Sequence, residues 1–253
     1  MKAPVHALTL SLCVLAQAVG AQPLTLRTTA QEGSAPKFIE SASSPISGHC
    51  PDILAALTKV DRGLHIDISP VPTPIKRIEG DLKEGRIDIV CALLATPLRS
   101  EIAHRISTPL FHVQERLVGR RDDAAGALSL NDLAQVGAPV VTQSGASYAA
   151  DLRQRGVNVI ETTGGSAIAL RAVASKRARF YYTNELTGAY YIRTESLGEQ
   201  LHLHPGVLQS SPSYLWASRR LDAPTLQRLE QAVAQLKRSG ELDRIYQRYQ
   251  RLQ

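Results

Sequence analysis

Along the chain, segments with an apolar residue at every second position alternate with segments with apolar residues at helical spacing, which predicts alternating strands and helices. Apolar residues recur at every second position in residues 24–29 and 64–71, as on half-buried strands. They recur at helical spacing in residues 51–60 and 75–84. Residues 87–94 form a nearly unbroken apolar run, which is typical of a central parallel strand covered on both faces.

A second cycle of the same kind follows. The pattern predicts strands at 139–142, 157–161 and 180–183, helices at 147–155 and 166–174, a further strand at 214–217, and a helical tail at 224–249 that is broken at Gly240. Strands that alternate with helices favour an α/β fold. Two such units in succession imply two lobes, each an open, mostly parallel sheet flanked by helices.

Composition and charge narrow the class of protein. The chain has 253 residues, of which 43% are hydrophobic and 21% charged, so a disordered or fibrous chain is excluded. The formal charge is +6, but no run of five like charges occurs. A nucleic-acid-binding surface is therefore not supported. No spacing of His and Cys points to a metal site.

The amino-terminal end resembles a secretory signal peptide. Lys2 precedes an apolar stretch at residues 7–19, and the small residues Gly20 and Ala21 follow it. We expect cleavage near Ala21, with residues 1–21 removed and the protein exported to the periplasm. Lys2 is the only charged residue in this segment, so 28 cations and 23 anions remain and the charge becomes +5.

Two cysteines, Cys50 and Cys91, remain after this cleavage. An even number of cysteines in an exported chain favours a disulfide, whereas the alternative is two buried free thiols. Helix N-termini and strand C-terminal ends gather at one edge of an open parallel sheet, so the two residues can meet beside a ligand site. Both interpretations remain open from the sequence.

Several short motifs, in order, resemble one family. They are GHCPDIL at 48–54, LKEGRIDIV at 82–90, TPLRSE at 96–101, STPLF at 107–111, VTQSGAS at 141–147, KRARF at 176–180 and LKRSGELDRIY at 236–246. Together they resemble the bacterial extracellular solute-binding proteins of family 3, the periplasmic receptors of polar amino-acid ABC importers.

The resemblance implies a type II periplasmic-binding-protein fold with the ligand in a cleft between two lobes. We expect the first lobe to comprise residues 22–111 and 212–253, and the second lobe residues 112–211. The resemblance also implies a monomer without a cofactor that delivers its solute to an inner-membrane ABC permease.

The same resemblance implies that certain residues of the first lobe contact the ligand. Arg99 would grip a ligand carboxylate with two parallel hydrogen bonds, unless it is a surface residue paired with Glu101 or Glu115. Thr96 would add a hydroxyl to that carboxylate, or would simply cap the following helix. Phe38 lies where relatives place an aromatic lid, although it could equally be a core residue.

In the second lobe, Gly145, Ala146 and Ser147 stand where a strand gives way to a helix. Free backbone N–H groups there would make an anion site, and the alternative is an ordinary turn. Asn184 occupies the position at which relatives carry an Asp for the ligand's ammonium group. An amide lacks the charge that holds an ammonium in a dry cleft, so we expect common amino acids to bind weakly.

The first-lobe pocket is expected to be more apolar than in relatives, because Leu94 replaces a hydroxyl-bearing residue. Arg77 is a candidate polar substitute. The leading function is a non-catalytic receptor for a small carboxylate-containing solute. The alternatives are a stand-alone sensory receptor and a periplasmic dehydratase that would use Glu185 or Glu32 as its general acid.

Overall fold

The computed structural model describes residues 23–41, 43–123 and 129–251, so the expected signal peptide lies outside the described residues. Its helices are α1 (His49–Val60), α2 (Ile75–Lys83), α3 (Pro97–Ile102), α4 (Leu130–Gln135), α5 (Tyr148–Gln154), α6 (Gly165–Ala174), α7 (Glu185–Thr194), α8 (Ala223–Arg238) and α9 (Glu241–Arg251). None of these helices has the length and apolar character that a membrane span requires.

The strands form two sheets. They are β1 (Leu24–Gln31), β2 (Leu64–Thr73), β3 (Ile89–Leu94), β4 (Ala103–Arg105), β5 (Phe111–Arg120), β6 (Val140–Gln143), β7 (Val159–Thr162), β8 (Phe180–Asn184), β9 (Leu201–Leu203) and β10 (Gln209–Ser218). Strands β1 and β2 pair in parallel. The larger sheet has the order β3-β10-β5-β8-β6-β7, with β4 on β10 and β9 on β5.

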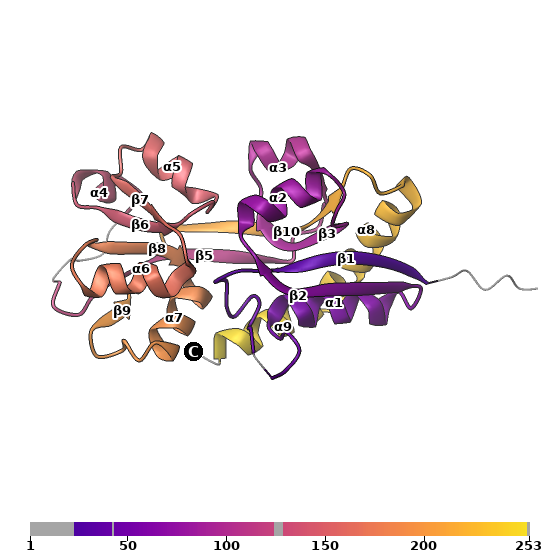
Figure 1. Cartoon of the computed structure of the whole chain (residues 1–253), viewed down its shortest axis with the longest axis horizontal. Helices are drawn as coiled ribbons and strands as arrows, with labels where there is room; N and C mark the ends of the chain where they lie inside the picture. Colours follow the sequence, from indigo (N-terminus) through magenta and orange to yellow (C-terminus); the bar gives the residue numbers. More distant parts are fainter. Residues whose placement is uncertain (1–22, 42, 124–128, 252–253) are drawn as a thin grey trace, which may run out of the picture.

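The molecule has two halves joined by two long strands. One half holds β1 to β3, α1 to α3 and α8, and the other holds β6 to β9 and α4 to α7 (Figure 1). Strands β5 and β10 run between the halves and pair antiparallel, from Phe111 opposite Ser213 to Glu115 opposite Gln209. Parallel pairing, as expected from the sequence, occurs in β1–β2, β6–β7 and β6–β8. Strand β3, expected from its apolar run to be a central parallel strand, instead lies at the end of the larger sheet and pairs antiparallel with β10, because β10 returns from the other half. Strands β4, β8 and β9 also pair antiparallel with the crossing strands, so the larger sheet is mixed rather than mostly parallel.

Strand β8 shows why a strand of the second half has a continuous apolar sequence. Phe180 and Tyr182 face one core with α4 and α5, whereas Tyr181 faces the other core with α6. Successive side chains of a strand point to opposite faces, so helices on both faces require apolar residues at every position. The two-lobed α/β class expected from the sequence is confirmed.

Strand β5 and the first part of β10, before the predicted strand at 214–217, were not predicted because their sequences interrupt a simple period. Strand β5 contains Glu115 and Arg116, and β10 contains Pro212 among serines. Glu115 is nonetheless buried, because Tyr182 and Ser211 donate hydrogen bonds of 2.6 and 2.7 Å to its carboxylate. A buried polar group is tolerated when it is hydrogen-bonded, and this one holds β8 and β10 to the crossing strand.

Candidate functional site

A pocket of about 120 Å³ lies between the two halves. It is lined by Gln31, Ser34, Lys37, His49, Ile75, Ala92, Leu93, Leu94, Arg99, Phe111, Val113, Gln143, Ser144, Gly145, Ala146, Ser147, Tyr148, Thr183, Asn184, Leu186, Thr187, Ser213 and Tyr246. Both halves and both crossing strands therefore contribute to it. No Asp or Glu is among these described lining residues.

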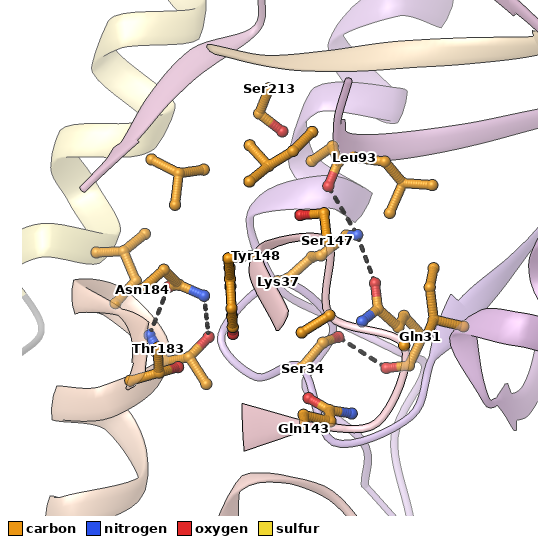
Figure 2. A pocket seen from close by; sticks show the side chains of 18 of the residues that line it. Gln31, Ser34, Lys37, Leu93, Gln143, Ser147, Tyr148, Thr183, Asn184 and Ser213 are labelled. Atoms are coloured by element: carbon orange, nitrogen blue, oxygen red, sulfur yellow. Dashed lines mark hydrogen bonds between the residues drawn. The ribbon is translucent and has the colours of Figure 1, made fainter. Parts of the chain in front are cut away.

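Lys37 carries a buried positive charge into this pocket. Its side chain is 9% exposed, and its ammonium donates hydrogen bonds of 2.8 Å to Gln31 Oε1 and 2.9 Å to the Ala92 carbonyl (Figure 2). It forms no ion pair with a carboxylate of the described residues. Burial and the nearby Arg99 lower the pKa of Lys37 well below its usual value.

The backbone around Lys37 is fixed by the start of α1. The amides of His49 and Cys50 donate to the carbonyls of Pro36 and Lys37, both at 3.1 Å. Gly48 permits this approach, because a Cβ there would lie 2.6 Å from both carbonyl oxygens. Its φ of 125° also favours glycine. The loop after β1 is therefore held in one position over the pocket.

A bulge in β3 provides the carbonyl that Lys37 binds. Cys91 and Ala92 together oppose the single residue Leu215 of β10, and Ala92 has a φ of 57°. A non-glycine residue in this region is strained, which is common where a backbone group serves a site. The Cys50–Cys91 disulfide, with Cα atoms 5.9 Å apart, joins the bulge to α1. The sequence left a disulfide and two free thiols as alternatives, and the structure contains the disulfide.

Arg99 lines the pocket but uses its guanidinium within its own half. Its Nε donates to Glu79 at 2.8 Å and its Nη1 donates to the Leu94 carbonyl at 2.8 Å. The ion-pair partner is therefore Glu79, rather than Glu101 or Glu115, and the two-bond grip expected of Arg99 is not free in this structure. Among the described residues, Glu79 pairs with Arg99, and no carboxylate pairs with Lys37.

His49 is a neutral neighbour of this charge. Its ring is 4% exposed and lies 5.1 Å from the Phe111 ring in an edge-to-face arrangement. It also contacts the rings of Tyr246 and Tyr249. Burial, reinforced by the Lys37 ammonium, lowers the pKa of His49 to about 3.

This depressed pKa predicts a loss of stability in acid. The unfolded chain takes up a proton on His49 near pH 6.5 and the folded chain only near 3. The contribution to stability is thus complete above pH 6.5 and falls as the pH drops toward 3. We expect His49→Phe, which retains a ring, to lose about 3 kcal/mol less than the wild type between pH 7 and pH 4. Urea unfolding at both pH values measures this, and equal losses would contradict it.

The second half closes the pocket with backbone and small side chains. Gly145, Ala146 and Ser147 line it as expected. The Gly145 amide, however, already donates to Glu161 at 3.2 Å. A Cβ at Gly145 would lie 2.3 Å from Ile75 of the opposite half, so glycine permits the halves to touch here.

The halves also meet through Gln143, which lines the pocket, and through Ser166. Gln143 donates to the Glu32 carbonyl and Ser166 donates to the Gly33 carbonyl, both at 3.1 Å. A Cβ on Gly33 would lie 2.7 Å from the Cα of Gly165. The structure therefore represents an arrangement in which the two halves contact each other around the pocket.

Asn184 and Leu94 line the pocket as expected, but Asn184 is also a helix cap. Its Oδ1 accepts from the Thr187 amide and its Nδ2 donates to Thr187 Oγ1, each at 2.9 Å (Figure 2). These bonds occupy the amide at the start of α7.

Three other expected residues lie elsewhere. Thr96 caps α3 by accepting from the Arg99 amide at 3.2 Å, so the capping alternative holds. Phe38 is 1% exposed in the first-half core and does not form a lid. The side chain of Arg77 is 76% exposed beside Asp81, so it does not compensate the apolar pocket.

The two candidate general acids do not line the pocket either. Glu185 faces away, toward Arg116 at 3.2 Å and Gln250 at 2.8 Å. Only the backbone carbonyl of Glu32 takes part in the contact between the halves, through Gln143. No cluster of three or more His, Cys, Asp or Glu that could hold a metal ion occurs in the described part of the chain.

Sequence reasoning missed Lys37, His49 and Ser213 as pocket residues. Lys37 and His49 adjoin residues that were singled out, Phe38 and Cys50, but neither has a spacing that marks it. A basic residue in the loop after the first strand, one position from an expected lid, was the available signal for Lys37.

Comparison with known proteins agrees with this architecture. An ancestral arginine-binding protein bound to glutamine superposes with a TM-score of 0.75 at 20% identity, over 89% of this chain and 97% of that one. A histidine kinase sensor domain similar to periplasmic binding proteins gives 0.76 at 20% identity, over 89% and 95%. An ancestral amino-acid-binding protein, a precursor of cyclohexadienyl dehydratase, gives 0.74 at 22% identity, over 89% and 94%.

At these identities the likeness establishes the fold alone. No curated protein matches the chain. Residues 26–251 match the bacterial extracellular solute-binding proteins, family 3. The match extends over nearly all of the described residues, from β1 to the end of α9. The chain belongs to the bacterial extracellular solute-binding proteins of family 3.

Proposed function

We propose that the protein is a non-catalytic periplasmic receptor that captures a small carboxylate-containing solute. One observation carries this proposal: Lys37 is buried in the pocket without a carboxylate partner, and no acidic residue lines the pocket among the described residues. An isolated buried charge is costly unless an opposite charge joins it. A solute carboxylate is the opposite charge that this pocket lacks.

Arg99 contributes to the same attraction through its charge. It lies close enough to Lys37 to lower the pKa of that lysine, while Glu79 neutralises one of the two cations. A monoanionic group beside Lys37 and Arg99 therefore completes the charge balance. A zwitterionic amino acid would bring an ammonium group for which the described lining residues offer no carboxylate.

Binding would draw together the two lobes, residues 22–111 with 212–253 and residues 112–211, about the crossing strands β5 and β10. Family membership supports delivery to an inner-membrane ABC permease by a monomer in the periplasm, after removal of residues 1–21. The absence of Glu32 and Glu185 from the lining favours binding over the dehydratase alternative.

A thermal-shift screen of residues 22–253 tests the proposal. The panel contains mono- and dicarboxylic acids, their uncharged amides, and amino acids. A solute that binds only the folded state raises the melting temperature, so at least one carboxylate is expected to do so while its amide does not. A panel in which no carboxylate raises the melting temperature would contradict the proposed function.

A further inference from the structure

Two polar side-chain atoms of the pocket residues have no hydrogen-bond partner in the described part of the chain. His49 Nδ1 and Ser213 Oγ are both buried and form no hydrogen bond with any described residue. Their residues are 4% and 1% exposed, and both line the pocket. Most buried polar side-chain atoms in proteins have a partner, so two orphans in one ligand pocket call for an explanation.

The two side chains flank the same aromatic residue. Ser213 of β10 lies directly opposite Phe111 of β5 in the antiparallel ladder, so their side chains share one face of the sheet. The Phe111 ring lies 5.1 Å from the His49 ring, and Tyr246 stacks on it at 4.7 Å. His49 and Ser213 are therefore both neighbours of Phe111 in the lining of the pocket.

His49 and Ser213 differ in chemistry from Lys37. A buried polar group without a partner costs roughly 1–3 kcal/mol, which a suitable solute atom would recover. The neutral imidazole and the serine hydroxyl carry no charge that would hold an ammonium or a second carboxylate. A solute hydroxyl can both donate and accept, so it can serve both groups whichever tautomer His49 adopts.

We infer that the solute is a hydroxy acid, with its carboxylate beside Lys37 and its hydroxyl between His49 Nδ1 and Ser213 Oγ. This inference rests on the proposed function and names the class of carboxylate. A site built to hydrogen-bond a solute hydroxyl discriminates strongly against the analogue without it, because its own buried polar groups are then left unpaired.

Titration calorimetry with matched pairs tests this. The pairs are lactate and propionate, malate and succinate, and phenyllactate and 3-phenylpropionate. We expect the hydroxylated member of at least one pair to bind about 10-fold tighter or more. Ser213→Ala should reduce that preference to about 3-fold or less, leaving the affinity for the acid without a hydroxyl nearly unchanged. Ser210→Ala, an exposed serine on the same strand, is the matched control and should retain the preference.

His49→Phe provides a second variant, which keeps a ring against Phe111 but removes both nitrogens. It too should lose the preference for the hydroxylated acid. If the members of every pair bind equally, and their binding still depends on Lys37, the hydroxy-acid inference is wrong and the proposed function stands. If no acid of any pair binds, the hydroxy-acid inference is wrong, and the proposed function falls with it only if no carboxylate of the wider panel raises the melting temperature.

Discussion

Lys37→Met is expected to weaken binding of the solute carboxylate by about 100-fold or more, because it removes a buried basic group of the pocket that has no carboxylate partner among the residues that the structure describes. Methionine keeps the unbranched apolar stem of lysine and is one atom shorter, so the shape of the pocket changes little. Arg99 remains but is paired with Glu79, and it cannot replace the lost charge.

The same variant is expected to keep the stability of the unliganded protein within about 1 kcal/mol. Two hydrogen bonds, to Gln31 and to the Ala92 carbonyl, are lost, but the cost of burying the ammonium is also removed. Calorimetry and urea unfolding measure the two effects. Lys59→Met, on the exposed side of α1, is the matched control and should change neither quantity. Unchanged affinity in the Lys37 variant would refute the role assigned to this residue.

Replacing Cys50 and Cys91 together by serine is expected to lower the free energy of unfolding by about 4 kcal/mol. The bridge closes a loop with a sequence separation of 41 residues, and a loop of that length loses this much chain entropy when crosslinked in the unfolded state. Both cysteines are fully buried in the first-half core, so serine hydroxyls there add a cost of their own.

Urea unfolding of the oxidised wild type, the reduced wild type and the double variant separates these contributions. The reduced wild type should lose most of the stability that the variant loses. Because the bridge joins the helix that carries His49 to the bulge that carries Ala92, reduction should also weaken carboxylate binding. Equal stability of oxidised and reduced wild type would mean that the bridge does not constrain the unfolded chain.

The alternation of strands and helices was predictable because the faces that each element buries in the fold determine where apolar residues occur in the sequence. Residues 87–94 and 180–183 read as buried strands because helices cover both faces of those strands. The crossing strands were harder, since Glu115 is buried through hydrogen bonds from Tyr182 and Ser211 that no local pattern contains.

The site was predictable in its location but not in its charge balance. Arg99, Leu94, Asn184 and the 145–147 turn do line the pocket. The pairing of Arg99 with Glu79, twenty positions away on another helix, has no sequence signal that distinguishes it from pairing with Glu101. Lys37 reaches the pocket only because Gly48 lets its loop dock on α1 and a bulge turns the Ala92 carbonyl toward it.

Calorimetric titration of residues 22–253 with a carboxylic acid and with the amino acid that differs from it only by an ammonium group tests the charge of the pocket most directly. Succinate with aspartate and propionate with alanine are suitable pairs. A pocket that, in the described part of the chain, has an unpaired Lys37 and no lining carboxylate should bind the acid about 10-fold tighter or more than the amino acid. Binding of either amino acid with a Kd below about 1 μM, or more tightly than its matched acid, would contradict the proposed charge balance of the pocket.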